Sequence, residues 1–391
     1  MRLLHPDGTP VHVAYCTNVH PAEDLDGVLI QLARYAEPVR ERLGAPVLGL
    51  GLWLARDAAA ALAADPGAVA GLRTELAARG LEVVTLNGFP YRGFHAPVVK
   101  HAVYRPDWTS HDRLDYTLDL ARVLAALLPD DAAHGSISTV PLGWRDPWDR
   151  EQQEAAARTL DALARELAEL EARTGRTVRV ALEPEPGCVV ETTAEAARHL
   201  AAVDTDRIGV CLDACHLATG FEDPAAALDR LDAAGLAVVK TQASCALQAD
   251  DPADPATRKA LAAFAEPRFL HQVREYGGPG TRPAAVDDLD AALAGALPGR
   301  APWRIHFHVP LHADPEPPLT TTRTQLEATL AALLGGDTAR TAHVEAETYT
   351  WGVLPADRRP DGPEALADGI AAELGWIRDH LLSLGLKEPA V

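Results

Sequence analysis

The sequence predicts a (β/α)8 TIM barrel, on three observations. Short runs rich in Val, Ile and Leu alternate with longer segments whose apolar residues recur at helical spacing. Eight such strand–helix units can be counted along the 391 residues, and repeated units of this kind imply parallel strands covered by helices. Polar and acidic side chains follow the later strands, where a barrel collects its chemistry. An open doubly wound sheet remains the alternative, because spacing alone does not show closure.

The predicted strands are short apolar runs bounded by Gly, Pro or polar residues. They comprise Val11–Thr17, Val47–Leu54, Leu81–Leu86, Ser136–Val140, Val178–Glu183, Ile208–Asp213, Ala237–Gln242 and Ala342–Glu347. The predicted helices comprise Leu25–Leu43, Ala58–Arg79, Arg113–Leu128, Glu151–Thr174, Thr193–Val203, Pro224–Ala234, Thr322–Leu334 and Pro363–Leu384. Two helices begin with a capping pattern, since Thr193 is followed by Glu195, and Asp223 by Pro224 at the first helical position.

The segment from Ser244 to Thr321 is too long for a simple crossover between two strands. It contains an apolar helix around Ala260, a strand Arg268–Arg274, a helix Val286–Leu297 and a strand Arg304–Pro310. We interpret residues 244–321 as an insertion between strands 7 and 8, a hairpin-bearing lid on the catalytic face of a single domain spanning residues 1–391. In the alternative interpretation, Ile305–His308 is a barrel strand and one of the eight predicted strands lies outside the barrel.

The loop Asn87–Ser110 concentrates aromatic residues among Gly and Pro. These residues are Phe89, Tyr91, Phe94, His95, Tyr104 and Trp108. Loops are usually solvated, so this concentration indicates either the wall of a pocket or a small core that anchors the loop to the barrel.

Composition and charge narrow the location and the partners. With 47% hydrophobic and 24% charged residues the chain is typical of a folded enzyme, and its net charge of -20 disfavours nucleic acid or an anionic membrane as a partner. Neither a signal peptide nor an apolar stretch of membrane-spanning length is visible, which indicates a cytoplasmic protein. The five cysteines include no CxxC pair, as expected for reduced thiols.

Several reaction classes lack their motifs. The chain has no Gly-rich phosphate loop in a strand–turn–helix setting, because Gly49 and Gly51 fall inside a predicted strand. It also has no GxSxG nucleophile elbow. Nicotinamide, ATP and serine-hydrolase chemistry are therefore disfavoured.

The fifth and sixth strands end in acidic residues. Glu183 and Glu185 close the fifth strand two positions apart, and Asp213 closes the sixth with His216 three residues later. Carboxylates at the ends of buried strands are unfavourable unless a cation or a hydrogen-bond donor meets them.

The seventh and eighth strands continue this pattern. The seventh carries Lys240 and ends in Gln242, and the eighth ends in Glu345 and Glu347 in phase. Four neighbouring strands with such ends predict a divalent metal ion held by oxygen ligands, as Mg2+ or Mn2+ prefers. For any single residue, a surface carboxylate or an ion pair with an arginine is the competing explanation.

Several histidines and amides are further candidates. His306 and His308 alternate, so they share one face of their strand, where they complete the metal sphere, shuttle protons or bind backbone carbonyls. With these histidines or His216 as ligands, the metal choice shifts towards Zn2+, Fe2+ or Co2+. After the first and third strands come Asn18, His20, Asn87 and His95.

The segments Leu182-Glu-Pro184 and Leu212-Asp-Ala-Cys-His216, with the terminal Glu347, resemble the xylose isomerase-like superfamily of sugar isomerases, epimerases and endonuclease-type barrels. The resemblance implies Glu183, Asp213, Gln242 and Glu347 as metal ligands and His216 as a substrate contact. Gln242 departs from the histidine found in the sugar epimerases, which leaves the metal as Mn2+, Mg2+ or Zn2+.

Other stretches resemble the EboE family of metabolite traffic proteins. They are Tyr15–Pro21, Leu86–Tyr91, Gly135–Gly143, His306–His312 and Glu345–Trp351, spread from the first strand to the last. This family is associated with gene clusters that export or relocate a precursor of a secondary metabolite.

These observations predict a metal-dependent isomerase or epimerase of a small polyhydroxylated metabolite. Glu183 and Glu347 would move a proton on and off carbon beside His216, while the metal binds adjacent substrate oxygens. The expected substrate contacts are His216, Lys240, His306, His308, Glu185, Asn18, His20, Asn87 and His95. A non-catalytic carrier on the same barrel and, less favoured, a metal-dependent phosphodiesterase are the alternatives. Protein partners from the same biosynthetic cluster and a homo-oligomer stay open.

Overall fold

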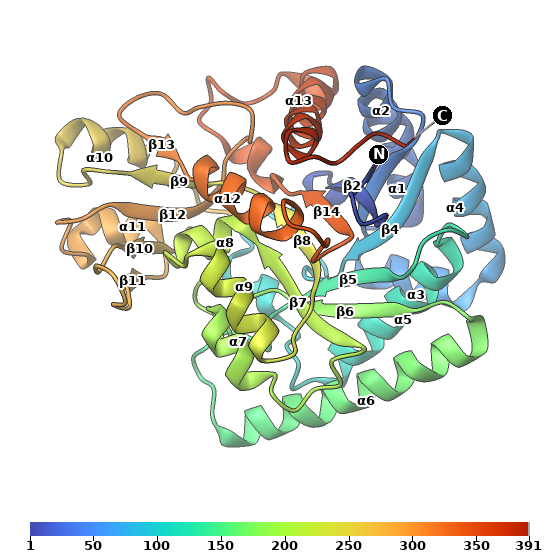
Figure 1. The fold of residues 1–391 in the computed structure, drawn as a ribbon. Coiled ribbons are helices and arrows are strands. Elements are labelled where there is room, and N and C mark those ends of the chain that lie inside the picture. The colour runs from blue at the N-terminus through green and yellow to red at the C-terminus, as the bar shows by residue number, and fades with distance from the viewer. Residues whose placement is uncertain (390–391) are drawn as a thin grey trace.

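The computed structural model describes residues 1–389 of the chain. Within this part, eight parallel strands form a barrel, which closes because β2 pairs with both β14 and β3 (Figure 1). The barrel strands are β2 (Pro10–Cys16), β3 (Leu48–Trp53), β4 (Leu81–Asn87), β5 (Gly135–Thr139), β6 (Val178–Leu182), β7 (Ile208–Asp213), β8 (Val238–Ala243) and β14 (His343–Ala346). Each of these strands begins and ends within one residue of a predicted strand. Because the sheet closes on itself, the prediction of a barrel is confirmed over that of an open sheet.

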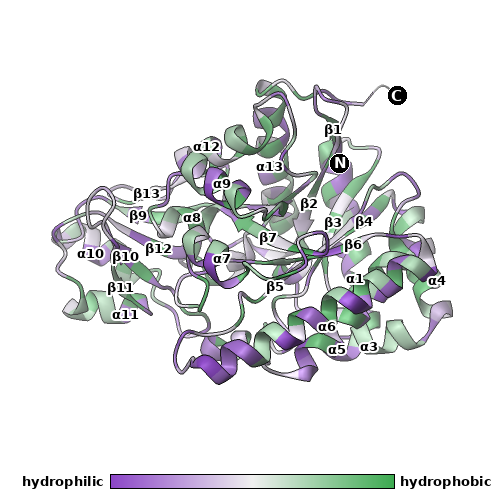
Figure 2. Ribbon diagram, turned by 60° about the horizontal axis from the view of Figure 1, so that its bottom comes forward, coloured by the Kyte–Doolittle hydropathy of each residue, from purple (hydrophilic) through white to green (hydrophobic). Residues whose placement is uncertain are grey.

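Helices between the strands cover the outside of the barrel. They are α1 (Leu25–Gln31), α2 (Glu37–Leu43), α3 (Arg56–Ala64), α4 (Pro66–Ala78), α5 (His111–Leu127), α6 (Arg150–Thr174), α7 (Thr193–His199), α8 (Ala214–Thr219), α9 (Pro224–Ala233), α12 (Arg323–Leu334) and α13 (Gly362–Ser383). Shorter helical turns are η1 (Thr17–Val19), η2 (Leu32–Ala36), η3 (Lys100–Tyr104) and η5 (Tyr349–Val353). Helices such as α6 alternate between hydrophilic and hydrophobic residues, as expected for one face on the barrel and one in water (Figure 2).

Helix boundaries differ from prediction where a cap or proline intervenes. The predicted helix Ala58–Arg79 is two helices, because the Asp65 side chain accepts hydrogen bonds from the first turn of α4 and Pro66 stands at its start. The cap of α7 is Thr192 rather than Thr193, with Glu195 completing a capping box. The short helix α8, which carries His216, is absent from the prediction.

Between β8 and β14 the chain forms a second, antiparallel sheet with the order β11-β10-β12-β9-β13. Its strands are β9 (Ala246–Ala249), β10 (Val273–Glu275), β11 (Ala284–Val286), β12 (Trp303–His308) and β13 (Thr320–Thr321), accompanied by α10 (Pro255–Ala262), α11 (Leu289–Ala291) and η4 (Ala292–Ala296). The alternative that placed Ile305–His308 in the barrel is therefore wrong. The predicted strand Arg268–Arg274 is confined to its last two residues and continues to Glu275, and the predicted helix Val286–Leu297 shrinks to Leu289–Ala296.

A short strand, β1 (Arg2–Leu4), pairs antiparallel with β2 at the start of the chain. The five cysteines are buried and unpaired. Among residues 1–389, we find no helix with the length and apolar character that membrane crossing requires.

Candidate metal centre and pocket

A cleft opens at the carboxyl ends of the barrel strands and is bordered by the second sheet. Its space, including the part open to solvent, is about 520 Å³. Polar groups line its floor: Asn18, Asn87, Glu183, Glu185, His216, His306, His308 and Glu347. Strand ends that are far apart in the sequence therefore meet in one place, as predicted for a barrel.

Three carboxylates gather at this floor. Glu183, Asp213 and Glu347 each place one oxygen within 4.8 Å of the other two, and all three are buried. Burial, together with Glu347 and Asp213, raises the pKa of Glu183 well above its ordinary value. Burial, followed by Asp213 and Glu345, raises the pKa of Glu347 to about 8. Concentrated negative charge away from water is unfavourable until a cation compensates it.

Unpaired oxygens test whether a cation fits this arrangement. Within residues 1–389, Glu183 Oε2, Asp213 Oδ2 and Gln242 Oε1 are buried and have no hydrogen-bond partner. Gln242 stands beside Asp213 in the register of β7 and β8, and its side chain is fully buried. Buried polar atoms are nearly always satisfied, so the open oxygens of Glu183 and Asp213, which belong to the same group of carboxylates, fit a divalent cation.

Asp213 owes its orientation to the local fold. Its Oδ1 caps helix α8 by accepting from the backbone N–H of His216, at 2.8 Å, and also accepts from the Ser244 hydroxyl, at 2.8 Å. Both bonds use the same oxygen, which leaves Oδ2 open. The Asp-x-x-His spacing thus has a structural cause, because the residue that caps a helix receives a hydrogen bond from the residue three positions later.

Glu347 is oriented by two amides, one from the turn after the neighbouring strand β2 and one from the end of β4. The side chains of Asn18 and Asn87 both donate to Glu347 Oε1, at 2.8 and 2.9 Å. Asn87 is in turn held by the backbone N–H of Phe89, which donates to its Oδ1 at 3.1 Å. The two predicted substrate contacts Asn18 and Asn87 line the pocket, and their amide groups position a carboxylate.

Three histidines lie against the carboxylates. The Nε2 atoms of His216 and His306 are 3.0 Å apart, and those of His306 and His308 are 3.2 Å apart. Burial lowers the pKa of His216 to about 4 and also lowers the pKa values of His306 and His308. These rings are therefore neutral at pH 7 and available as ligands.

Glu185 occupies a separate position on the pocket wall. It accepts a hydrogen bond of 2.6 Å from the Tyr104 hydroxyl, and burial raises its pKa to about 8 although this bond acts in the opposite direction. Its carboxylate shares a cluster with His216 and His306 rather than with Glu183. The two glutamates that end the fifth predicted strand thus face different neighbours.

Three of the predicted substrate contacts lie away from the pocket lining. Lys240 forms an ion pair with Glu345, and both side chains are fully buried inside the barrel. His20 stacks on Tyr35, with ring centroids 4.0 Å apart. His95 contacts the backbone oxygen of Asn18 at 2.7 Å.

The aromatic loop after β4 forms one wall of the pocket. Phe89, Phe94 and Tyr104 line it, whereas Tyr91, His95 and Trp108 pack elsewhere. Further residues line the pocket without having been predicted as site residues from the sequence: Pro90, Lys100, Val103, Phe269, Leu270 and Tyr349. Lys100 and Val103 belong to the loop Asn87–Ser110, whose aromatic content predicted that it lines a pocket. Phe269 and Leu270 belong to the segment between β8 and β14, where no sequence motif indicates a pocket.

Several solved structures share the fold of this chain. The D-allulose 3-epimerase of Methylomonas sp. matches with a TM-score of 0.51 at 14% identity, covering 97% of this chain and 99% of the other. An L-ribulose 3-epimerase matches with a TM-score of 0.50 at 13% identity, covering 96% and 95%. The D-psicose 3-epimerase of Clostridium cellulolyticum H10 matches with a TM-score of 0.50 at 14% identity, covering 95% and 99%.

Sequence comparison gives the family. No curated protein matches the chain by sequence. Residues 41–257, which include six of the barrel strands from β3 to β8, match the family described as xylose isomerase-like TIM barrel. The chain therefore belongs to the xylose isomerase-like TIM barrel family.

Proposed function

We propose that this chain is a metal-dependent isomerase or epimerase of a small polyhydroxylated metabolite. The observation that carries the proposal is the pair of open, buried oxygens on Glu183 and Asp213, whose carboxylates gather with that of Glu347. The sugar epimerases among the similar structures support the same chemistry at the level of fold.

The proposed metal ligands are Glu183, Asp213, Gln242 and Glu347. When bound there, a divalent cation supplies Lewis acidity to two adjacent oxygens of the substrate. The donor set is rich in oxygen, which favours Mn2+ or Mg2+ over softer ions.

The proton transfer is assigned to two carboxylates. One of Glu183 and Glu347 removes the proton from the carbon next to a substrate carbonyl, and the other returns a proton to the opposite face of that carbon. One oxygen of each carboxylate lies within 4.8 Å of the other, so both groups border the same part of the pocket. Asn18 and Asn87 hold Glu347 in place during this exchange.

The remaining groups of the pocket suit a polyol. The lining combines hydrogen-bonding groups with apolar rings: His216, His306, His308 and Glu185 with Phe89, Phe94 and Phe269. A sugar has both kinds of surface, because its hydroxyl groups alternate with C–H faces.

The test is exchange of carbon-bound hydrogen with solvent. The metal-loaded protein is incubated in D2O with a panel of ketoses, aldoses and cyclic polyols, and deuterium incorporation is measured by NMR. We expect Glu183→Gln and Glu347→Gln each to lower the exchange rate by about 10²–10⁴-fold. Glu82→Gln is the matched control, because Glu82 is also buried but bonds with Arg2 and His12 at the opposite end of β4.

Two outcomes would contradict the proposal. If the two pocket variants exchange hydrogen as fast as the control, the assigned carboxylates are wrong. If a panel member binds tightly but takes up no deuterium, the protein is a carrier of the metabolite rather than an enzyme.

We place this activity in the biosynthesis or trafficking of a secondary metabolite in the cytoplasm, on the resemblance to the EboE family. Deleting the gene and profiling metabolites by mass spectrometry would test this placement. The expected result is accumulation of a polyhydroxylated precursor, and an unchanged profile would contradict it.

A further inference from the structure

One group of polar side chains in the pocket lies beside the proposed metal ligands without belonging to them. Glu185, His216 and His306 each offer one oxygen or nitrogen within 4.8 Å of the other two, and all three are buried. They come from the turn after β6, from α8 and from β12, so the group forms where the barrel meets the second sheet. All three line the pocket and are therefore placed to bind part of a substrate.

Hydrogen bonds on Nδ1 fix the tautomer of two of the pocket histidines. His216 Nδ1 lies 3.0 Å from the carbonyl oxygen of Pro184, and His308 Nδ1 lies 2.6 Å from the carbonyl oxygen of Glu347. A backbone carbonyl only accepts, so each Nδ1 carries a hydrogen and donates it. In a neutral imidazole the other nitrogen, Nε2, then only accepts hydrogen bonds.

A longer chain of hydrogen bonds fixes the tautomer of His306. With Glu185 ionised, the Tyr104 hydroxyl donates to Glu185 Oε1 at 2.6 Å and accepts from the side-chain nitrogen of Gln272 at 2.9 Å. The side-chain oxygen of Gln272 then faces His306 Nδ1, at 2.7 Å, and this nitrogen must donate to it. His306 Nε2 therefore also only accepts.

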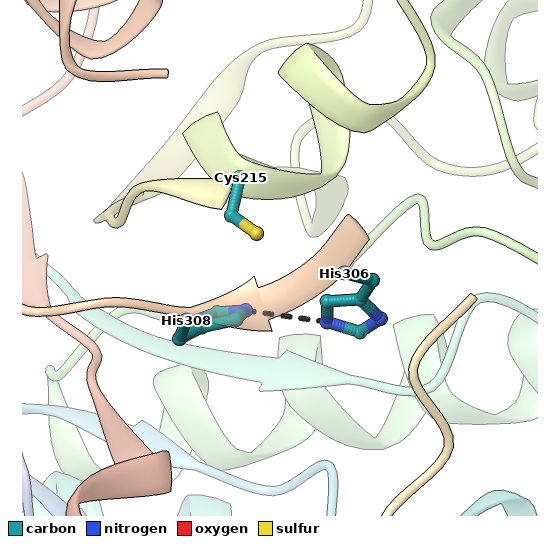
Figure 3. Close-up of side chains that lie close together, drawn as sticks. All are labelled: Cys215, His306 and His308. Carbon is teal, nitrogen blue, oxygen red and sulfur yellow. Dashed lines mark hydrogen bonds between the residues drawn. The ribbon is translucent and has the colours of Figure 1, made fainter. Parts of the chain in front are cut away.

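The Nε2 atom of His306 lies close to the Nε2 atoms of two other rings. The distances are 3.0 Å to His216 and 3.2 Å to His308, and Figure 3 shows the second contact as a dashed line. Nitrogens that only accept have no hydrogen between them, so their lone pairs repel one another at these distances. A ligand that donates hydrogens to them would remove this repulsion.

The charge of the pocket lining favours a cation at this position. Within residues 1–389, the lining contains no arginine and one lysine, Lys100, which is paired with Asp288. The acidic lining residues are Glu183, Glu185 and Glu347. An ammonium beside Glu185 favours its ionised form, although burial raises the pKa of this residue. A phosphate or carboxylate at the same place would be repelled.

We propose that the substrate of this pocket carries a primary ammonium group, as an amino sugar or an aminocyclitol does, and that Glu185, His216 and His306 bind this group. An ammonium group offers three N–H donors and no acceptor, which matches one oxygen and two nitrogens that only accept. A hydroxyl group donates a single hydrogen. The inference rests on the proposed function for the position of the substrate and adds its chemical class.

Binding of matched amines and alcohols tests the inference. Calorimetry gives the Kd of the Mg2+-loaded full-length protein at pH 7 for pairs that differ in one substituent: D-glucosamine and D-glucose, D-galactosamine and D-galactose, D-mannosamine and D-mannose, and 1-amino-1-deoxy-D-fructose and D-fructose. In at least one pair we expect the amine to bind at least about tenfold more tightly, because hydrogen bonds to a charged group are the stronger ones. If no amine binds more tightly than its partner, including the case in which neither binds, the inference is overturned.

A variant of Glu185 tests the assigned contact. Glu185→Gln keeps an oxygen that accepts from Tyr104 and removes the negative charge. We expect it to lose the preference, with affinity for the amine reduced about tenfold or more and affinity for the alcohol little changed. Glu82→Gln is the matched control and should keep the preference, because Glu82 is also buried but bonds with Arg2 and His12. A folded Glu185→Gln protein that keeps the preference overturns the inference, and if this variant does not fold, the paired titrations of the wild type decide.

Failure of this inference can be distinguished from failure of the proposed function, because binding is measured without turnover. Deuterium uptake by an alcohol, with no preference for the amine, leaves the proposed function standing and overturns the inference. An amine that binds preferentially but takes up no deuterium supports the inference and contradicts the proposed function.

Discussion

Replacing Lys240 by methionine should strongly destabilise the barrel. The Lys240 ammonium pairs with Glu345 inside the barrel, and the side chains of both are 0% exposed. Methionine fills a similar volume but leaves the Glu345 carboxylate buried without a counter-charge, and Glu345 Oε1 has no hydrogen-bond partner in the described part of the chain. Breaking one side of a buried ion pair costs about 3–5 kcal/mol. The free energy of unfolding, measured by urea titration with circular dichroism, should fall by that amount.

The double variant Lys240→Met/Glu345→Met is the control. Removing both charges removes the desolvation penalty of each, so most of the lost stability should return. A single variant that loses less than about 1 kcal/mol, or a double variant as unstable as the single one, would refute the reasoning.

The remaining predictions concern space, pH, metal and positioning. Gly51→Ala should cost about 3 kcal/mol or more, or prevent folding, because an added Cβ would lie 1.6 Å from Glu345 Oε1, and urea titration measures the loss. Burial raises the pKa of Glu373 from the ordinary 4.5 to about 7, so the folded state holds this proton more tightly than the unfolded state and the free energy of unfolding falls as the pH rises from 4.5 to 7. Glu373→Gln should make the free energy of unfolding, measured by urea titration, less dependent on pH between 5 and 8. The same pH dependence in the variant and the wild type would contradict this. Removing metal with a chelator should lower the melting temperature, since an ion at 100 times its Kd stabilises the folded state by about 2.7 kcal/mol. An unshifted scanning-fluorimetry curve would count against the proposed metal site. Asn18→Leu should lower the hydrogen-exchange rate at least about tenfold with little change in KM, because it removes one of two donors to Glu347, and an unaltered rate would make Asn18 irrelevant to positioning.

The barrel strands were predictable from sequence because both faces of each strand are covered. Such strands are continuous apolar runs with abrupt ends, as in Ile208–Asp213, and those ends define the edge where side chains meet. Acidic residues at that edge, such as Glu183 and Asp213, were for that reason recognisable as candidates.

The position of Lys240 was not predictable from the same pattern. Residues two apart on a strand share a face, but the one further from the strand end lies a layer deeper in the barrel. Gln242, at the end of β8, is paired in register with Asp213, whereas Lys240 lies two residues earlier and forms an ion pair with Glu345. The alternation of residues along a strand predicts which face of the strand a side chain lies on, but not how deep in the barrel it lies.

The second sheet was only partly predictable. Its strands are short, and β9 pairs with β12, which lies more than fifty residues later in the chain. The local sequence of each strand therefore does not predict which strand it pairs with. The contact between the Nε2 atoms of His216 and His306 depends on that pairing and on the position of α8, so it could not be predicted from the spacing of these residues in the sequence.

The junction between the two sheets restricts how a ligand reaches the floor of the pocket. Only Ser244 and Cys245 separate β8 from β9, both are fully buried, and Ser244 bonds to Asp213 and to the backbone N–H of Cys215. A hinge needs residues that are free to change their backbone angles, and these two are not. The second sheet is thus a fixed side of the pocket entrance, and the loop after β4 is bonded to it as well, because the backbone N–H groups of Val99 and Lys100 both donate to the carbonyl oxygen of Arg268.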